Sequence, residues 1–248
     1  MAIHDFKSQR LFVDTELQIG QVVACSSEQA NYLRNVLRLT AGTEILIFNG
    51  RHGEWRARLE FAGKKGCTLQ AVELMRPQAE GPDIHYLFAP LKRSRLDYMV
   101  QKATELGVAR LRPVLTRYTV AERVNLDRMR ANAIEAAEQC GILRIPEVAE
   151  PDRLQRVIDG WDDSRPLVFC DEAADVPDPL AALATLPRGP AGLLIGPEGG
   201  FADEEREMLI RQPYTLRLSL GPRIMRADTA AVAALALINA VVGDWRTV

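Results

Sequence analysis

The sequence has few of the residues that hold metal ions or cross-link small proteins. Only four of its 248 residues are cysteine and three are histidine. The cysteines are Cys25, Cys67, Cys140 and Cys170, and the histidines are His4, His52 and His85. They are too scattered for the paired ligands of a zinc site, and their spacing indicates no disulfide framework. We therefore expect neither a bound metal nor structural disulfides.

Segments for membrane insertion and secretion are also missing. The longest apolar stretch, 230–242, contains Asn239 and is rich in alanine. It is shorter than the roughly 20 residues that a transmembrane helix needs. No long apolar run follows the first ten residues, as it would in a secretory signal. These absences predict a cytosolic protein.

Two further absences restrict the function. The formal net charge is only −2, so any nucleic-acid contact must come from a local basic patch. The chain also lacks GxGxxG after a strand and GxxxxGK[ST], which excludes the usual dinucleotide and P-loop sites.

The hydrophobic pattern divides the chain into two domains. Residues 1–75 contain expected strands at 10–13, 44–48, 54–61 and 67–74, separated by glycine turns, which predicts a small β-barrel. One helix, capped by Ser27, interrupts these strands and places Arg34 and Arg38 one turn apart. The polar segment 76–82 carries two prolines and a glycine and predicts a linker.

Residues 83–248 alternate between strands and helices, which predicts an α/β domain with a mostly parallel sheet covered on both faces. The expected strands are 84–89, 111–115, 166–170, 193–195 and 216–220. The expected helices are 96–107, 125–140, 179–186, 203–210 and 228–242. The last helix is apolar around nearly its whole circumference, so we expect the core and a second subunit to bury it.

Two glycine-containing turns end neighbouring apolar strands of this second domain. One is Gly196-Pro-Glu-Gly-Gly200 and the other is Gly221-Pro-Arg223, followed by Ile224-Met-Arg226. Because glycine has no side chain, a ligand can approach the backbone there, and ligands of open α/β sheets bind beyond the carboxyl ends of the strands. The turns therefore predict a pocket that contains one carboxylate and two arginines.

The two turns belong to longer motifs that resemble those of the RsmE family of RNA methyltransferases. The motifs are Leu194-Ile-Gly-Pro-Glu-Gly-Gly200 and Leu220-Gly-Pro-Arg-Ile-Met-Arg-Ala-Asp-Thr229. Further blocks follow the family's order: Arg10-Leu-Phe-Val13, Tyr32 to Arg38, Gln101 to Gly107, Glu138 to Gly141 and Arg144-Ile-Pro146. The resemblance covers the whole chain.

This resemblance implies the fold, the reaction and the partners. It implies a SPOUT methyltransferase domain with a deep trefoil knot over 83–248 and an RNA-binding, PUA-like β-barrel over 1–75. It also implies S-adenosylmethionine as the cofactor, and a homodimer that builds each active site from both subunits. The expected reaction is methylation of N3 of a uridine in 16S ribosomal RNA of the small ribosomal subunit, at nucleotide 1498.

Three positions depart from the family pattern. Ile142 stands where an arginine is usual, although Arg144 lies close by in sequence. Asp228 replaces a glutamate. Ala202 replaces a helix-capping serine or threonine, a role that Asp203 could take over.

The candidate catalytic residues are Glu198, Arg223 and Arg226. Uridine N3 is a weak nucleophile until it loses its proton, so the site needs a base or a cation that stabilises the developing anion. Glu198 either accepts this proton, orients bound groups, or only binds amides of its own turn. Arg223 and Arg226 either contact the substrate or pair with a local acid such as Asp228. Asp228 itself is expected to cap the last helix.

The candidate cofactor contacts lie at three strand ends. They are Phe169, Cys170, Asp171, Leu194, Ile195, Gly196, Gly199, Gly200, Leu220, Gly221, Ile224, Met225 and, by the resemblance, Thr229. The candidate RNA contacts are basic residues of both domains, namely Arg10, Arg34, Arg38, Lys92, Arg93 and Arg95. Two other functions stay open: a SPOUT enzyme with a different RNA target, and a non-catalytic RNA-binding ribosome-assembly factor.

Overall fold

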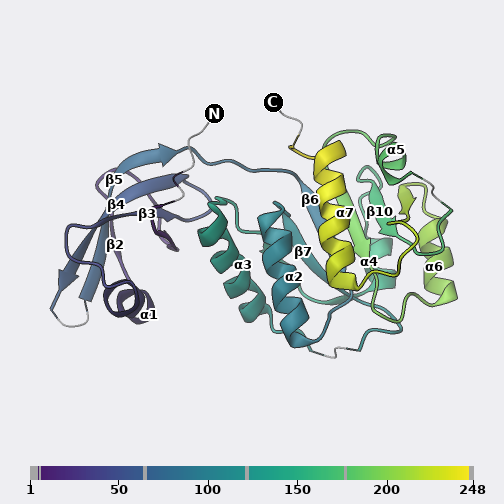
Figure 1. Cartoon of the computed structure of the whole chain (residues 1–248), viewed down its shortest axis with the longest axis horizontal. Helices are drawn as coiled ribbons and strands as arrows, with labels where there is room; N and C mark the ends of the chain where they lie inside the picture. Colours follow the sequence, from purple (N-terminus) through teal and green to yellow (C-terminus); the bar gives the residue numbers. More distant parts are fainter. Residues whose placement is uncertain (1–4, 6, 64–65, 121–122, 176–177, 246–248) are drawn as a thin grey trace. The chain divides into compact units, whose positions relative to one another are not determined.

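The computed structural model describes residues 5, 7–63, 66–120, 123–175 and 178–245, and the chain folds into two compact units (Figure 1). The first unit comprises residues 1–80 and 137–145, and the second comprises 81–136 and 146–248. The division after residue 80 falls within the predicted linker. No pattern in the sequence predicted that 137–145 packs with the first unit.

The first unit contains a five-stranded sheet with strand order β1-β3-β4-β5-β2. The strands are β1 (Arg10–Phe12), β2 (Val22–Ala24), β3 (Glu44–Phe48), β4 (Glu54–Ala62) and β5 (Gly66–Arg76). Strand β1 is parallel to β3, and the other pairings are antiparallel. Every predicted strand is present, and β2 was not predicted.

The helix of the first unit is shorter than expected. It consists of α1 (Ser27–Asn31) and a π-helical segment, η1 (Tyr32–Val36). The N-cap is Ser26 and not Ser27, because the Ser26 hydroxyl accepts the Gln29 N–H at 3.1 Å. Arg38 lies beyond the helix with a φ of 56°, so Arg34 and Arg38 are not one α-helical turn apart.

The cysteines of this unit lie closer together than their spacing suggests. Cys25 directly follows β2, Cys67 lies on the neighbouring strand β5, and their Sγ atoms are 3.1 Å apart. None of Cys25, Cys67, Cys140 and Cys170 forms a disulfide. Strand pairing between distant segments creates this proximity, which is why spacing along the chain could not reveal it.

A buried ion-pair network joins the strands of the first unit. Glu54, which is 2% exposed, accepts hydrogen bonds from Arg10 at 2.9 Å and from Arg76 at 2.8 Å. Arg76 also donates to the carbonyl oxygen of Gly141 at 2.8 Å. Arg10 is only 5% exposed, so the prediction that it contacts RNA is wrong, and we remove it from the candidate RNA surface.

The network should make the stability of the first unit depend on pH. Burial alone would raise the pKa of Glu54, but hydrogen bonds from Arg76 and Arg10 hold this pKa below the ordinary value of 4.5. A carboxylate whose pKa is lower in the folded state stabilises the fold above its unfolded pKa, and this contribution is lost as the pH falls. At neutral pH we expect Glu54→Gln to lower the free energy of unfolding by about 2 kcal/mol.

Chemical denaturation at several pH values, with hydrogen exchange of β4 amides as a local readout, measures this effect. The difference in the free energy of unfolding between wild type and Glu54→Gln should become smaller as the pH falls below 4.5. Glu73→Gln is the matched control, because Glu73 pairs with Arg56 on the surface, where ion pairs contribute little. If the difference in the free energy of unfolding between wild type and Glu54→Gln does not change with pH, the stabilising role of the ionised Glu54 carboxylate is contradicted.

The second unit is built on a parallel sheet with the order β12-β10-β11-β6-β7-β8, with β9 also paired to β7. Its strands are β6 (Ile84–Phe88), β7 (Arg110–Leu115), β8 (Glu147–Val148), β9 (Asp152–Arg153), β10 (Leu167–Cys170), β11 (Ala191–Ile195) and β12 (Thr215–Leu218). Five of these strands were predicted, and β8 and β9 were not.

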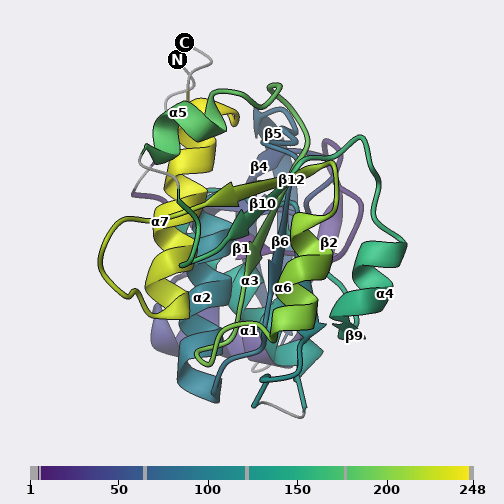
Figure 2. The same ribbon diagram turned by 90° about the vertical axis from the view of Figure 1, so that its right-hand side faces the viewer.

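Helices cover both faces of this sheet, as predicted. They are α2 (Arg93–Glu105), α3 (Leu126–Cys140), α4 (Leu154–Asp159), α5 (Pro179–Leu183), α6 (Asp203–Ile210) and α7 (Ala227–Val241). Figure 2 shows α2 and α7 on one face and α4 and α6 on the other. Only α4 was not predicted. Of the helices that the structure describes, none has the length and hydrophobicity needed to span a membrane.

Candidate functional site

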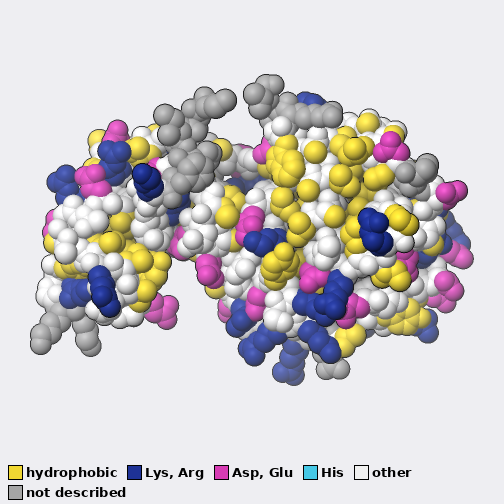
Figure 3. Space-filling model, in the orientation of Figure 1, with side chains coloured by type: hydrophobic (Ala, Val, Ile, Leu, Met, Phe, Trp, Pro, Cys, Tyr) yellow, Lys and Arg dark blue, Asp and Glu magenta, His cyan; other side chains and the backbone are white. Residues whose placement is uncertain are grey.

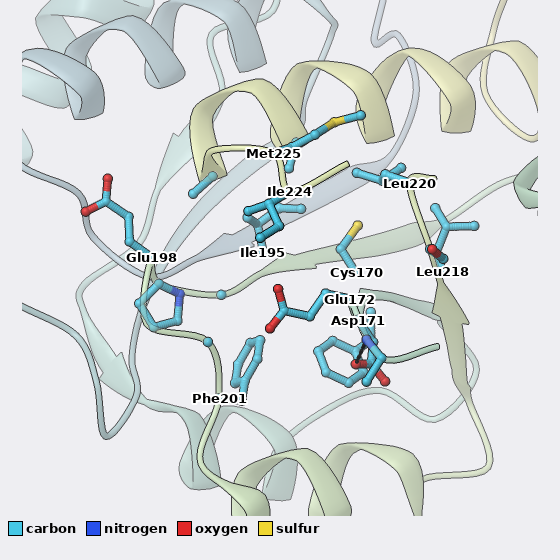
Figure 4. A pocket seen from close by; sticks show the side chains of 18 of the residues that line it. Cys170, Asp171, Glu172, Ile195, Glu198, Phe201, Leu218, Leu220, Ile224 and Met225 are labelled. Carbon is cyan, nitrogen blue, oxygen red and sulfur yellow. Dashed lines mark hydrogen bonds between the residues drawn. The ribbon is translucent and has the colours of Figure 1, made fainter. Parts of the chain in front are cut away.

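The two predicted glycine turns meet at one cavity of about 660 Å³, beyond the carboxyl ends of β10, β11 and β12 (Figure 4). The candidate cofactor residues that line it are Phe169, Cys170, Asp171, Ile195, Gly196, Gly199, Gly200, Leu220, Gly221, Ile224 and Met225. All three candidate catalytic residues, Glu198, Arg223 and Arg226, also line it. The parallel order of the three strands brings these separate segments together.

Two candidate cofactor residues do not line the cavity. Leu194 is fully buried and belongs to the hydrophobic core that also contains Leu154 and Leu209. Its side chain alternates with that of Ile195, which lines the cavity. Thr229 lies exposed in the first turn of α7. Their contact with a cofactor stays a prediction, which for Leu194 would have to involve the backbone.

Gly196 fits closely against an aromatic side chain that the sequence did not single out. A Cβ atom on Gly196 would lie 2.4 Å from Cε2 of Phe201, which is too close for any contact. Phe201 lines the cavity and packs edge-to-face on Phe169, with ring centroids 5.1 Å apart. Gly196 is therefore needed for the aromatic wall. At Gly199 a Cβ would make only an ordinary contact, 3.5 Å from Cβ of Tyr118.

Asp171 holds the cavity wall together through two arginines. Its carboxylate accepts hydrogen bonds from Arg206 on α6 at 3.0 Å and from Arg217 on β12 at 2.8 Å. The Ala173 N–H donates to it as well. Burial tends to raise the pKa of Asp171, but hydrogen bonds from Arg206 and Arg217 keep the pKa below its ordinary value. With both oxygens occupied, this carboxylate has a structural role, and a direct contact with a cofactor is not supported.

The candidate catalytic groups lie at the mouth of the cavity. The Glu198 carboxylate forms an ion pair with Arg95 of α2, and Figure 4 shows it directed away from Ile195 and Cys170. Arg223 and Arg226 are exposed, and neither forms an ion pair within the described part of the chain. The alternative in which they pair with Asp228 is therefore not observed.

The beginnings of two helices differ from expectation. Helix α7 starts after Arg226 as N-cap, so Asp228 lies inside its first turn, where its carboxylate accepts the Thr229 N–H at 3.0 Å. Helix α6 starts after Ala202, and Asp203 is its first residue and not a replacement cap. The Glu205 carboxylate accepts the Ala202 N–H at 3.1 Å and so satisfies one free backbone group there.

The comparisons with known proteins agree with this architecture. The family model for an RNA methyltransferase domain matches residues 79–239, and the model for an RNA methyltransferase PUA domain matches residues 26–72. A ribosomal RNA small subunit methyltransferase E from Synechocystis is 33% identical over 94% of this chain and 77% of its own length. The chain belongs to the RsmE family. The family member from Bacillus subtilis is 29% identical over 93% of this chain and 96% of its own length.

The RsmE-type fold also agrees with solved structures. A methyltransferase from Legionella pneumophila in complex with S-adenosylmethionine is 30% identical, with a TM-score of 0.85. The match covers 96% of this chain and 99% of that one. The fold expected from the resemblance, an α/β methyltransferase domain with an N-terminal PUA domain, is confirmed.

One RsmE motif has a structural role in this chain. The Glu138 carboxylate accepts the Phe12 N–H at 2.7 Å, and Gly141, with a φ of 65°, leaves room for the Arg10 guanidinium. Ile142, at the position where the family usually has arginine, packs beside Phe48. The motif therefore fixes the segment 137–145 to the first unit.

The basic candidates differ in how accessible they are. Arg34 donates to the carbonyl oxygens of Gly63 and Gly66 and covers the Phe61 ring at 4.2 Å, so it mainly holds the β4–β5 hairpin. Arg38 is exposed. Figure 3 shows Lys and Arg side chains gathered around the lower end of α2, where exposed Lys92 and Arg93 lie at the helix N-terminus. Positive charges at a helix N-terminus interact unfavourably with the helix dipole, so these residues do not stabilise α2. Their clustering instead favours binding of an anionic partner.

Proposed function

We propose that this protein transfers a methyl group from S-adenosylmethionine to N3 of a uridine in 16S ribosomal RNA of the small ribosomal subunit. The reaction would take place in the cytoplasm. The observation that carries the proposal is the single cavity formed by both RsmE motifs at the ends of β11 and β12. The names of the relatives and the S-adenosylmethionine in the Legionella structure support the substrate and the cofactor.

The cavity fits such a cofactor. Its volume of about 660 Å³ lies within the range of small-molecule sites. Leu220, Ile224 and Ile195 offer an apolar surface for an adenine ring, and the glycines at 196, 199 and 200 leave the backbone accessible. When bound, the cofactor supplies an electrophilic methyl group, so the protein needs neither a metal nor a covalent intermediate.

The residues at the cavity mouth would activate the uridine. Glu198 would accept the N3 proton, and its ion pair with Arg95 keeps the carboxylate at the mouth. Arg223 and Arg226 would stabilise the negative charge that develops on the uracil oxygens. Their exposure and lack of ion pairs among the described residues support this role.

The basic residues at the start of α2, with Arg38 of the first unit, would bind RNA phosphates. We expect the double variant Lys92→Ala/Arg93→Ala to weaken RNA binding and to reduce the dependence of log Kd on log salt by about one to two units. Equilibrium binding at several salt concentrations measures both effects. Arg156→Ala is the control, because Arg156 is 76% exposed on α4. A double variant with unchanged affinity and salt slope would refute the proposed contacts.

The protein would act as a homodimer through α7. Val232, Ala233, Ala236 and Leu237 of this helix are only partly buried, and Figure 3 shows hydrophobic side chains along it. A second copy of the chain would cover this face and complete the active site. Light scattering on the purified protein tests the dimer.

The second unit would also contain the trefoil knot that the resemblance implies.

The test of the proposed function is methyl transfer from labelled S-adenosylmethionine to small ribosomal subunits that lack the modification. Transfer to another RNA would favour a methyltransferase with a different target. RNA binding without any affinity for S-adenosylmethionine would favour the non-catalytic assembly factor. The presence of Glu198, Arg223 and Arg226 in the cavity lining already favours an enzyme over such a factor.

A further inference from the structure

An exposed tyrosine lies at the edge of the cavity and has no part in the roles assigned so far. Tyr118 follows β7, and its side chain is 47% exposed. Its Cβ atom would be 3.5 Å from a Cβ placed on Gly199, so it borders the glycine turn that carries Glu198. A large aromatic side chain left open to solvent beside a ligand cavity is a candidate contact surface.

The turn that presents Tyr118 is held in a defined conformation. The Thr119 N–H donates to the carbonyl oxygen of Thr116 at 3.1 Å, and the Thr116 N–H donates to Oγ1 of Thr119 at 2.8 Å. The two threonine hydroxyls are 3.0 Å apart. These bonds close the turn from both ends and leave Arg117 and Tyr118 at its tip.

The same turn is bound to the wall of the cavity. The Glu205 carboxylate accepts the Arg117 N–H at 2.9 Å through one oxygen and the Ala202 N–H at 3.1 Å through the other. Ala202 follows Phe201, which lines the cavity. The backbone that carries Tyr118 is therefore tied to the cavity wall by hydrogen bonds, which place this residue at the edge of the cavity.

The surroundings of Tyr118 suit a nucleotide. Within the described residues its hydroxyl group has no hydrogen-bonding partner, so nothing there fixes the ring for a structural purpose. Arg117, in the same turn, is 65% exposed and pairs with the exposed Glu204 at 3.7 Å, and Arg95 lies beside Glu198. An aromatic face flanked by arginines is the combination that binds unstacked bases and their phosphates.

We propose that Tyr118 stacks on the base of the acceptor uridine and holds it at the mouth of the cavity; this inference rests on the proposed function. The acceptor base is favoured over a neighbouring one, because Tyr118 borders the turn of Glu198, the residue assigned to the N3 proton. A base turned out of its RNA stack loses its neighbours, and an aromatic side chain replaces them. Tyr118 is thus a positioning residue that selects an accessible, unpaired uridine.

Steady-state kinetics on small ribosomal subunits give the first test. Tyr118→Ala should raise KM for the RNA substrate about tenfold or more, since stacking on one aromatic side chain has an effect of this size. Tyr118→Phe keeps the ring and should stay within about twofold of wild type. Both variants should bind S-adenosylmethionine normally, which also reports that the second unit is folded. Tyr98→Ala, at a residue of α2 that is 45% exposed, is the control for losing a surface tyrosine.

A binding cycle shows whether the acceptor base itself is contacted. A short RNA carries either uridine or an abasic site at the position that the wild-type enzyme methylates. Removing the base should weaken binding to wild type about tenfold and to Tyr118→Ala hardly at all, because the two changes remove the same contact. Additive losses, or Tyr118→Ala with an unchanged KM, would overturn the inference. If wild type forms N3-methyluridine in the same assay, this failure leaves the proposed function intact.

Discussion

Replacing Glu198 by glutamine is expected to lower kcat about 100-fold or more while S-adenosylmethionine affinity stays within about twofold. Removing a general base costs about 10²- to 10⁴-fold in rate. The amide has nearly the shape of the carboxylate but cannot accept the N3 proton at neutral pH. Single-turnover methyl transfer with saturating RNA and cofactor measures the chemical step, and calorimetry measures cofactor affinity.

Glu207→Gln is the matched control for this experiment. Glu207 is an exposed glutamate that pairs with Arg211 on α6, as Glu198 pairs with Arg95, but it does not line the cavity. The control should retain the wild-type rate. Full activity of Glu198→Gln would show that the carboxylate only organises its turn, and the arginines would then carry the activation of the uridine.

Gly196→Val is expected to reduce S-adenosylmethionine affinity about 100-fold or more. A Cβ atom there would come within 2.4 Å of the Phe201 ring, and valine adds two methyl groups beyond it. Phe201 cannot move without losing its packing on Phe169, so the ring and the new side chain would intrude on the cavity. Calorimetric titration of the purified variant with S-adenosylmethionine measures the loss.

Gly199→Ala provides the comparison within the same turn. Its Cβ would make an ordinary contact of 3.5 Å with Tyr118, and we expect the affinity to change by no more than about threefold. Similar affinities for the two variants would mean that the close fit between Gly196 and Phe201 does not define the cofactor site. Circular dichroism of both proteins separates a lost site from a lost fold.

Local patterns in the sequence were sufficient to locate the strands and helices of the second unit and the two turns of the cavity. Strands that are buried on both faces give continuous apolar runs, and glycines at their ends mark where a ligand can approach. Helix 203–210 was predicted with the bounds that the structure shows. Helix α4 was not predicted, because six residues are too few for a clear helical period.

Side-chain roles that depend on distant partners could not be read from the sequence. Arg10 looked like an RNA contact, because nothing near it in sequence reveals that Glu54 is buried against it. Asp171 looked like a cofactor contact until Arg206 and Arg217 accounted for its oxygens. Arg95 was assigned to RNA alone, although it also pairs with Glu198. Only the three-dimensional pairing of charges distinguishes these cases.

The most direct measurement is the identity of the methylated nucleoside. Small ribosomal subunits that lack the modification are incubated with the protein and S-adenosylmethionine, and their RNA is digested and analysed by mass spectrometry, with Glu198→Gln as the parallel reaction. We expect N3-methyluridine from wild type and little or none from the variant. A methyl group on another nucleoside would contradict the proposed substrate, and no product in a protein that also fails to bind S-adenosylmethionine would contradict the assignment of the cavity.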